Sequence, residues 1–519
     1  MISNVSNELL VGKIDSEIMK GKNCSFVLPD TSVDETEKIL SSLPDDKSPG
    51  YDLIDNKLLK YAAPYITRPV KYLFNLPLQQ GVFPTEWKHA KICPTSKDAK
   101  ISFTASNSRP ISLLSSLSKI LERVVSDHIW KYVESNNLLT RAQHAYRKNH
   151  STETALIDMT DEWLSALDQG KLVSLLLLDF TAAFDLIDHT ILLEKLTHYG
   201  FSKNAINWMS SYLNGRKASI YVNGSFSSPR TLTCGIPQGS CLGPLLFIIY
   251  TNDLPLVLAN SNAHMFADDT TITAAADSQT RLYEYLSNDF KSAIKWVENN
   301  KLVLNINKTK YMIICTTRKR RKLKPWHLTY GSVNIEEVTE AKLLGVKIQN
   351  NLSWAAHITD LSKRVMKMAG MSGRIVKFLS KDTLKVICHS LVYSHISYCC
   401  AVWGNAALRD MRRLQITLNK AARMVLRCGF ERAVSELHAM MGGPTVLEHV
   451  KQHSIALISK IKKFSKPVSI KDKLLLVCEK HQVNVRIRDK NHYVLPKTKT
   501  EMGRRTFIFR TIKLWNSLQ

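Results

Sequence analysis

One short stretch, residues 264–272, constrains this chain more than any other. Apolar and β-branched residues lie on both sides of an acidic pair, Asp268 and Asp269. The flanking residues predict two strands, and because aspartate tolerates turn geometry, we expect the pair on the tight turn between them. Two adjacent like charges repel, and a divalent cation that prefers oxygen ligands, such as Mg²⁺, would offset that repulsion. For an isolated pair, an ordinary solvated turn is the alternative interpretation.

Composition identifies a folded chain with a strongly basic surface. Hydrophobic residues make up 44% and charged residues 22% of its 519 residues, so we expect a globular protein of two or more compact units. Lys and Arg number 71 against 45 acidic residues, which gives a net charge of +26. An excess of this size favours binding to a polyanion, and a merely solvated basic surface is the alternative.

The sequence gives no sign of a membrane or a secretory route. No apolar run approaches the roughly 20 residues that a membrane-spanning helix needs, and the first residues lack the charged and apolar segments of a secretory signal. The ten cysteines are scattered without a Cys-x-x-Cys pair. Reduced thiols are typical of intracellular proteins, so we expect a location in the nucleus and/or the cytoplasm and no membrane partner.

Hydrophobic periodicity predicts a mixture of helices and strands. Residues 172–178 form a nearly continuous apolar run, as expected for a strand buried on both faces. Asn223–Gly224 predicts a hairpin between strands at 219–222 and 226–232. Further strands are expected at residues 302–304 and 311–315, and helices at residues 34–43, 65–80, 117–133, 189–196 and 277–297, followed by mainly basic helices over 353–430.

A third carboxylate, Asp179, directly follows the buried strand at 172–178. A strand-end carboxylate that faces a pair on a hairpin is the layout of a two-metal phosphoryl-transfer site, in which two cations about 3.5–4 Å apart contact the attacking and leaving oxygens. Each aspartate alone has an ordinary structural explanation. The strand-end and hairpin contexts together favour the interpretation of these aspartates as catalytic residues.

Three motifs in this region resemble the polymerase motifs of reverse transcriptases. Leu-Asp-Phe-Thr-Ala-Ala-Phe-Asp at 178–185 is similar to the first, Gly-Ile-Pro-Gln-Gly at 235–239 to the second, and Phe-Ala-Asp-Asp at 266–269 to the third, in the family's order and spacing. Other stretches resemble reverse transcriptases of non-LTR (LINE-type) retrotransposons of the jockey and CR1 type: the finger motifs at 107–113 and 145–152, the fourth motif at 304–310, the primer grip at 343–354, and residues 48–52 and 514–518.

The resemblance implies a set of catalytic residues. Two Mg²⁺ ions, with Mn²⁺ as an alternative, would be held by Asp179, Asp268 and Asp269 together with the backbone carbonyl of Phe180. In the fourth motif a lysine would protonate the leaving pyrophosphate, and we choose Lys308 over Lys310.

The resemblance also implies residues that bind the substrates. Phe184 corresponds to the aromatic ring that crowds the sugar 2′ position and so favours deoxynucleotides; ordinary core packing is an equally good explanation of that ring. Gln238 and Gly239 would contact the incoming nucleotide and template, and Arg109 and Arg147 would grip triphosphate and template. The glycines at 235–239 allow close backbone approach, although a simple hairpin loop also uses glycine.

We therefore expect an α+β right-hand polymerase. An N-terminal helical lead-in would cover residues 1–79, the reverse transcriptase domain with fingers and palm 80–348, a helical thumb-like region 349–430, and a basic C-terminal extension 431–519. The expected activity is RNA-directed synthesis of DNA from dNTPs on a primer 3′-OH, with an RNA template and a DNA primer or target as partners. Nothing resembles an endonuclease or RNase H domain, so a truncated or adopted nucleic-acid-binding fragment without catalysis is the alternative.

One cysteine- and histidine-containing stretch invites a metal-binding interpretation. Cys388, His389, His395, Cys399 and Cys400 lack the two close pairs typical of zinc sites. The apolar and aromatic residues between them, Tyr398 included, instead predict a buried helix.

Overall fold

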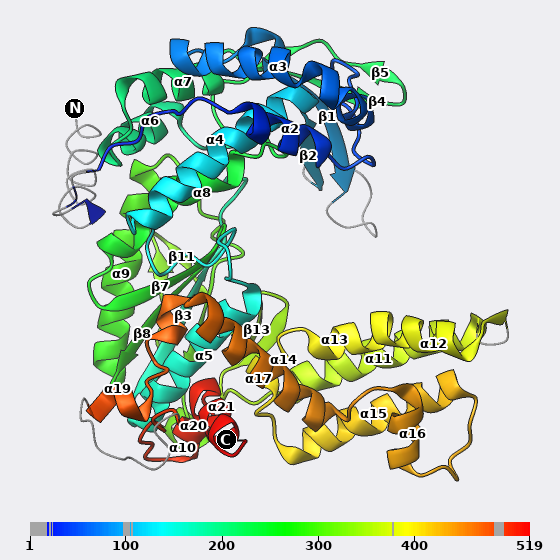
Figure 1. Cartoon of the computed structure of the whole chain (residues 1–519). Coiled ribbons are helices and arrows are strands. Elements are labelled where there is room, and N and C mark those ends of the chain that lie inside the picture. The colour runs from blue at the N-terminus through cyan, green and yellow to red at the C-terminus, as the bar shows by residue number, and fades with distance from the viewer. Residues whose placement is uncertain are drawn as a thin grey trace. The chain divides into compact units, whose positions relative to one another are not determined.

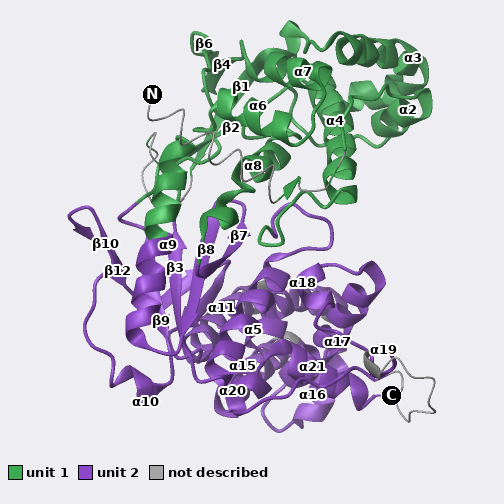
Figure 2. Ribbon diagram, turned by 90° about the vertical axis from the view of Figure 1, so that its left-hand side faces the viewer, with its two compact units in different colours: residues 1–143, 180–259, 290–305 green, residues 144–179, 260–289, 306–519 purple. Residues whose placement is uncertain are grey.

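The computed structural model describes residues 24–96, 107–375, 378–481 and 492–518, together with positions 18, 19, 22 and 104. Helices and strands both contribute, which confirms the mixed fold class (Figure 1). The chain forms two compact units, each assembled from separate segments (Figure 2). Unit 1 combines residues 1–143, 180–259 and 290–305, and unit 2 combines residues 144–179, 260–289 and 306–519. The predicted segment boundaries at residues 80, 349 and 431 stay predictions.

Unit 1 contains a five-stranded sheet and several amphipathic helices. Its strands are β1 (His89–Ser96), β2 (Ser108–Leu113), β4 (Lys217–Val222), β5 (Ser225–Phe226) and β6 (Arg230–Thr231). The order is β2-β1-β4-β5, with β6 also on β4. Its helices are α2 (Val33–Ser41), α3 (Asn56–Gln80), α4 (Ser116–Ser135), α6 (His189–His198), α7 (Lys203–Leu213) and α8 (Gly243–Thr251).

The predicted hairpin at Asn223–Gly224 is confirmed, because both residues adopt left-handed φ angles, of 50° and 82°, between β4 and β5. The predicted helix at 65–80 is longer than expected, and α3 begins at Asn56 despite three internal prolines. An apolar face that continues through Leu59, Val70 and Phe74 is buried along the whole helix. The free energy gained by burying this face offsets the loss of the backbone hydrogen bonds that the prolines cannot form.

The sheet of unit 2 has the order β12-β9-β3-β8-β7. The predicted buried strand is β3, at its centre, and is confirmed. The predicted strand at 302–304 is wrong: Leu304 forms only an isolated bridge with Phe180. The strands of this sheet are β3 (Leu172–Leu178), β7 (Ser261–Phe266), β8 (Asp269–Ala276), β9 (Lys310–Ile314) and β12 (Glu336–Glu337), and separate ribbons pair β10 (Thr329–Tyr330) with β11 (Val333–Asn334) and β13 (Glu340–Leu343) with β14 (Val346–Gln349).

One hydrophobic core in unit 2 joins this sheet to helices from both ends of the unit. Buried residues of β3 and β9 pack in the same cluster as those of α5, α11, α15, α17 and α21. The longer helices are α5 (Thr152–Asp168), α9 (Gln279–Asn299), which runs from unit 2 into unit 1, α11 (Ala355–Ile375), α12 (Lys381–Cys388), α15 (Leu408–Leu426), α16 (Val434–Met441), α17 (Val446–Phe464) and α21 (Phe507–Asn516).

Shorter helical segments complete the described fold. They are η2 (Thr85–Lys88), η3 (Leu254–Val257), α10 (Thr317–Arg320), η5 (His389–Tyr393), α13 (Ser394–Ser397), α14 (Cys400–Trp403), α18 (Val468–Lys471), α19 (Val477–His481) and α20 (Glu501–Arg504). Among the described helices, none combines the length and apolar character needed to cross a bilayer.

Candidate active site

The acidic pair lies at the tip of the β7–β8 hairpin, as predicted. Phe266 pairs with Asp269, so Ala267 and Asp268 are the two turn residues and Asp269 is the first residue of β8. Ala267 adopts a left-handed φ of 58°, which the backbone twist of a two-residue hairpin requires and which costs a non-glycine residue about 1 kcal/mol or more. Strain of this kind is often concentrated at functional sites.

Asp179 lies beside this tip because of strand register. β3 and β8 are antiparallel neighbours, and their pairing ends with Leu178 opposite Thr270. One further step in each strand brings Asp179 to the level of Asp269. The predicted meeting of a strand-end carboxylate with the hairpin pair is therefore a direct result of the sheet order.

The electrostatics of the three carboxylates fit a cation site. Burial raises the pKa of Asp179, and the charge of Asp268 adds to this rise. Burial likewise raises the pKa of Asp269, with further contributions from Asp268 and Asp179. A divalent cation would relieve this mutual repulsion. The three carboxylates are not among the described groups whose ligand atoms all lie within 4.8 Å of one another.

Lys308 supplies a positive charge at this site. β9 is the other neighbour of β3 and runs antiparallel to it. Lys308 precedes β9 and Asp179 follows β3, so both residues lie at the same end of this strand pair. The Lys308 ammonium is 3.9 Å from the Asp179 carboxylate and is mostly exposed. Thr309 accepts a hydrogen bond from the Asp179 backbone N–H at 3.4 Å. Lys310, the alternative lysine, is instead paired with Glu336 at 2.9 Å, so of the two lysines Lys308 is the one that pairs with Asp179.

A pocket of about 480 Å³ opens beside these groups. Asp179, Asp269 and Lys308 line one part of it, and the β13 residues 340–343 line another. The strand β13 belongs to the β13–β14 hairpin, the stretch that resembles the primer grip. Asp179, Asp269 and this hairpin therefore share one cavity within unit 2.

Tyr398 contacts the turn of the β13–β14 hairpin, a contact that sequence reasoning missed. The Tyr398 hydroxyl donates to the carbonyl oxygen of Leu344 at 2.8 Å, and the side chain is 43% exposed. The prediction that Tyr398 is buried in a helix is wrong, because Tyr398 is the C-cap residue that follows α13. A Cβ on Gly345, whose φ is +82°, would lie 3.0 Å from the tyrosine ring. No local sequence pattern indicates a contact that joins residues more than fifty positions apart.

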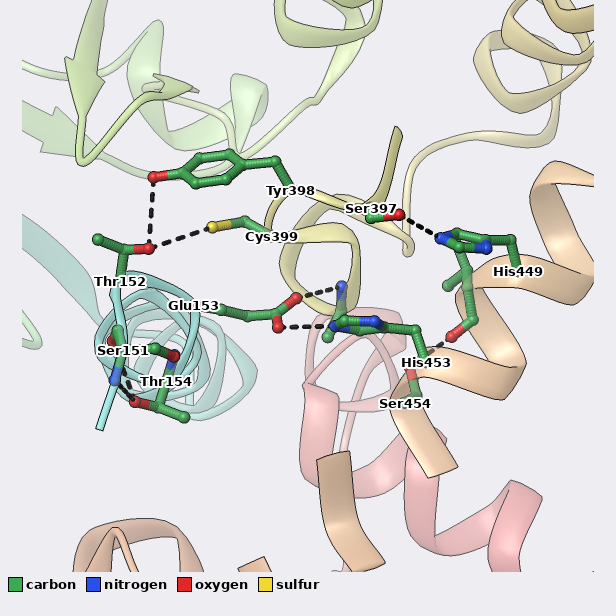
Figure 3. Close-up of polar contacts among 12 residues, drawn as sticks. Ser151, Thr152, Glu153, Thr154, Ser397, Tyr398, Cys399, His449, His453 and Ser454 are labelled. Atoms are coloured by element: carbon green, nitrogen blue, oxygen red, sulfur yellow. Dashed lines mark hydrogen bonds and ion pairs between the residues drawn. The ribbon is translucent and has the colours of Figure 1, made fainter. Parts of the chain in front are cut away.

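The N-terminus of α5 is held by the same region (Figure 3). The Tyr398 hydroxyl also lies 3.3 Å from Thr152, and Glu153 accepts hydrogen bonds from the Ala401 backbone N–H at 3.0 Å and from His453 at 2.8 Å. Burial of Cys388, Cys399 and Cys400 confirms the packing interpretation of that stretch.

The predicted nucleotide-binding residues of unit 1 form a group of their own. The Gln238 amide donates to both oxygens of Asp185, at 2.8 and 3.0 Å, and its backbone carbonyl accepts from Ser112 N–H at 2.7 Å. Gly239, at a φ of 132°, passes so close to the Ser112 carbonyl that a side chain would clash. The turn at 235–239 is therefore packed on β2, the strand that also carries the exposed Arg109.

Phe184 is half-buried and stacks on Phe247 of α8, with ring centroids 4.3 Å apart. Both proposed explanations of this ring, core packing and contact with a nucleotide sugar, are compatible with a side chain that is packed on one face. Phe180 is half-buried next to Asp179 and bridges to Leu304. Arg147 lies in unit 2, half-buried, between Tyr146 and Asn149, which both have left-handed φ angles.

Comparisons with known proteins show which families the chain is similar to. Residues 96–348 match the family model described as reverse transcriptase (RNA-dependent DNA polymerase). The chain is 29% identical to a probable RNA-directed DNA polymerase from transposon BS and 27% identical to one from transposon X-element, both of Drosophila melanogaster. It is 28% identical to the RNA-directed DNA polymerase from mobile element jockey of Drosophila funebris.

Each of these alignments covers 81% of this chain but only 46–47% of the relative. The chain thus spans about half the length of the curated relatives it matches. Proteins of this family generally use divalent metal ions. Residues 96–348 of this chain are thus similar to the reverse transcriptase domain of LINE-type, non-LTR retrotransposons.

Proposed function

We propose that this chain is an RNA-directed DNA polymerase that adds deoxynucleotides to a primer 3′-OH opposite an RNA template. The observation that carries the proposal is the register that brings Asp179 to the level of Asp269 beside the Asp268 turn. We propose Mg²⁺ as the resident cation, two ions in number, held by these three carboxylates and the Phe180 carbonyl. When bound, the ions would favour ionisation of the primer hydroxyl and neutralise charge on the pyrophosphate.

The chain's own groups would then position the reactants and move a proton. Lys308, exposed and 3.9 Å from Asp179, is the proposed proton donor to the leaving pyrophosphate. Gln238, whose amide is oriented by Asp185, would contact the nucleotide and template. Arg109 and Arg147 would bind triphosphate and template, and Phe184 would exclude a ribose 2′-OH.

In terms of a right-hand polymerase, we propose fingers and palm within 80–348, a thumb over 349–430 and a basic extension over 431–519. A groove of about 440 Å³ on α15 supports a nucleic-acid-binding role for the proposed thumb. Several exposed cationic side chains line it: Arg409, Arg412, Arg413 and Lys420. This groove and the net charge of +26 favour polyanionic partners, an RNA template and a DNA primer or target, and we place the protein in the nucleus and/or the cytoplasm.

Primer extension on poly(rA)–oligo(dT) with Mg²⁺ tests the proposal. Each metal contact is worth several kcal/mol in a phosphoryl transition state, so Asp268→Asn should lower extension by about 1,000-fold while affinity for the hybrid stays within about twofold. The matched control is Asp277→Asn, which removes an exposed carboxylate just beyond β8 and should leave extension unchanged.

Two results would count against the proposal. Extension by Asp268→Asn within about threefold of the unsubstituted protein would refute the metal assignment. Hybrid binding by the unsubstituted protein with no extension at all would favour the alternative, a nucleic-acid-binding fragment without catalysis.

A further inference from the structure

A second group of potential metal ligands lies in unit 2 and contains none of the three predicted catalytic carboxylates. It consists of His144 in the segment before α5, Asp158 on α5 and His264 on β7, and one ligand atom from each lies within 4.8 Å of the others. His144 is 1% and His264 7% exposed. The Nε2 atom of His144 is 3.8 Å from the nearer oxygen of Asp158, which is close but not a hydrogen bond.

His144 is the anomaly in this group. Both of its ring nitrogens are buried and neither has a hydrogen-bond partner. A buried polar group without a partner costs about 1–3 kcal/mol, and such groups are rare in folded proteins. A bound metal ion would give one of these ring nitrogens a partner.

The surroundings of the other two ligands resemble an outer shell of a metal site. His264 Nε2 lies 2.9 Å from a carboxylate oxygen of Glu162, whose other oxygen accepts a hydrogen bond from Asn262 at 3.0 Å. A carboxylate behind a histidine fixes the orientation of the ring and is the usual partner of metal-ligating imidazoles. Lys473 binds one oxygen of Asp158 at 3.0 Å, and the other oxygen is the one nearer His144.

We propose that His144, Asp158 and His264 bind a Zn²⁺ ion. Two imidazole nitrogens and one carboxylate oxygen suit zinc, and a water molecule would complete a tetrahedral set. The proposal does not depend on the proposed polymerase activity. Its consequence would be mechanical: the ion would join α5 and the preceding segment to β7, the strand that leads directly into the Asp268 turn. The His144 backbone N–H already donates to the Met265 carbonyl of β7 at 2.9 Å.

The other mixed group of possible ligands, Glu153, Cys400 and His453, is a weaker candidate. Both oxygens of Glu153 already accept hydrogen bonds, from Ala401 N–H and from His453. Burial and the charge of Glu153 raise the pKa of the Cys400 thiol, which opposes formation of the thiolate that zinc binds. This second group therefore supplies a matched control.

The test is zinc stoichiometry by mass spectrometry on the full chain, expressed with added zinc and dialysed against millimolar Mg²⁺ to occupy the carboxylates of the polymerase site. We expect roughly one zinc per chain. The His144→Gln variant should retain less than a tenth of that amount, and His453→Gln should retain all of it. Loss of zinc in His453→Gln with retention in His144→Gln would overturn the assignment.

Thermal unfolding gives a second measurement that needs no variant. Removal of zinc from the unsubstituted protein by a chelator should lower the Tm by about 5 °C, and added Zn²⁺, but not Mg²⁺, should restore it. If the unsubstituted protein holds no zinc and the chelator leaves its Tm unchanged, the proposal is wrong and water molecules are the hydrogen-bond partners of the His144 nitrogens. This readout stays decisive even if His144→Gln fails to fold.

Discussion

Asp168 offers a quantitative test of how the C-terminal segment is attached to α5. This residue ends α5 and is 9% exposed. Its carboxylate accepts hydrogen bonds from the Lys499 N–H at 2.9 Å, the Thr500 N–H at 2.6 Å and the Thr500 hydroxyl at 2.8 Å. A Cβ on Gly503 would lie 2.6 Å from the same carboxyl group. The segment that leads into α20 thus wraps around one charged side chain of α5.

The cost of removing Asp168 follows from these contacts. A hydrogen bond to a charged acceptor contributes about 1.5–3 kcal/mol. In Asp168→Ala the backbone N–H donors lose this acceptor, and water molecules replace it only in part. We expect about 3–5 kcal/mol of lost docking free energy. Because each 1.4 kcal/mol is a factor of ten, amide hydrogen exchange in α20 and α21 should accelerate by about 100- to 5,000-fold.

Hydrogen-exchange mass spectrometry on peptides from 492–518 measures this effect directly. The control is Glu501→Gln, which removes a 77% exposed carboxylate whose partner Arg504 is 4.0 Å away and should change exchange by less than threefold. An acceleration below about fivefold in Asp168→Ala would show that the docking does not depend on this carboxylate, and would refute the reasoning.

The same contact has a defined pH dependence. Burial alone would raise the pKa of Asp168, but the hydrogen bonds from Lys499, Thr500 and Gly503 outweigh it and hold the pKa below its usual value. A depressed folded-state pKa means that the carboxylate stabilises docking above the unfolded pKa and that this stabilisation is lost as the pH falls through the folded one. The protection of α20 and α21 should therefore decline below about pH 4 in the unsubstituted protein, whereas Asp168→Ala should lack this step.

Two further predictions concern substrate selection and binding. If the Phe184 ring excludes the 2′-OH, Phe184→Ala should raise the incorporation of ribonucleotides relative to deoxynucleotides by at least about tenfold, which corresponds to a loss of roughly 1.4 kcal/mol of discrimination. Unchanged selectivity with a lowered Tm would instead assign Phe184 to packing on Phe247. Affinity for an RNA–DNA hybrid should fall steeply with salt, and Arg409→Ala combined with Arg412→Ala should reduce the log–log slope by about 1.5 through lost counterion release, whereas an unchanged slope would exclude the α15 groove from phosphate contact.

Local sequence was sufficient for the features that depend on near neighbours. The apolar run of β3 and the left-handed turn at Asn223–Gly224 were both predicted correctly, because strand burial and turn chemistry are encoded within a few residues. The hairpin at Asp268–Asp269 was recognised for the same reason. Its meeting with Asp179 was a prediction drawn from strand-end context, and the β3–β8 register supplies the physical cause.

Local patterns failed where distant packing overrode them. The helix predicted at 65–80 was too short, since a continuous buried face holds α3 from Asn56 onward despite its internal prolines. Tyr398 was expected inside a helix and instead contacts the β13–β14 turn. In both cases the deciding partners lie far away in the sequence, and no short window contains them.

By itself, the sequence predicted the kind of chemistry, from three carboxylates and a glycine-containing turn in an order and spacing that resemble those of reverse transcriptases. Only the tertiary structure decided which other groups stand beside them. It paired Lys308 with Asp179 and left Lys310 to Glu336, because both lysines lie near the start of β9 and only neighbouring strands settle which one faces the carboxylates. It also brought His264 to His144 and Asp158, which lie more than a hundred residues earlier in the sequence. Side chains become ligands of one site through the packing of strands and helices, a property that spacing along the chain does not contain.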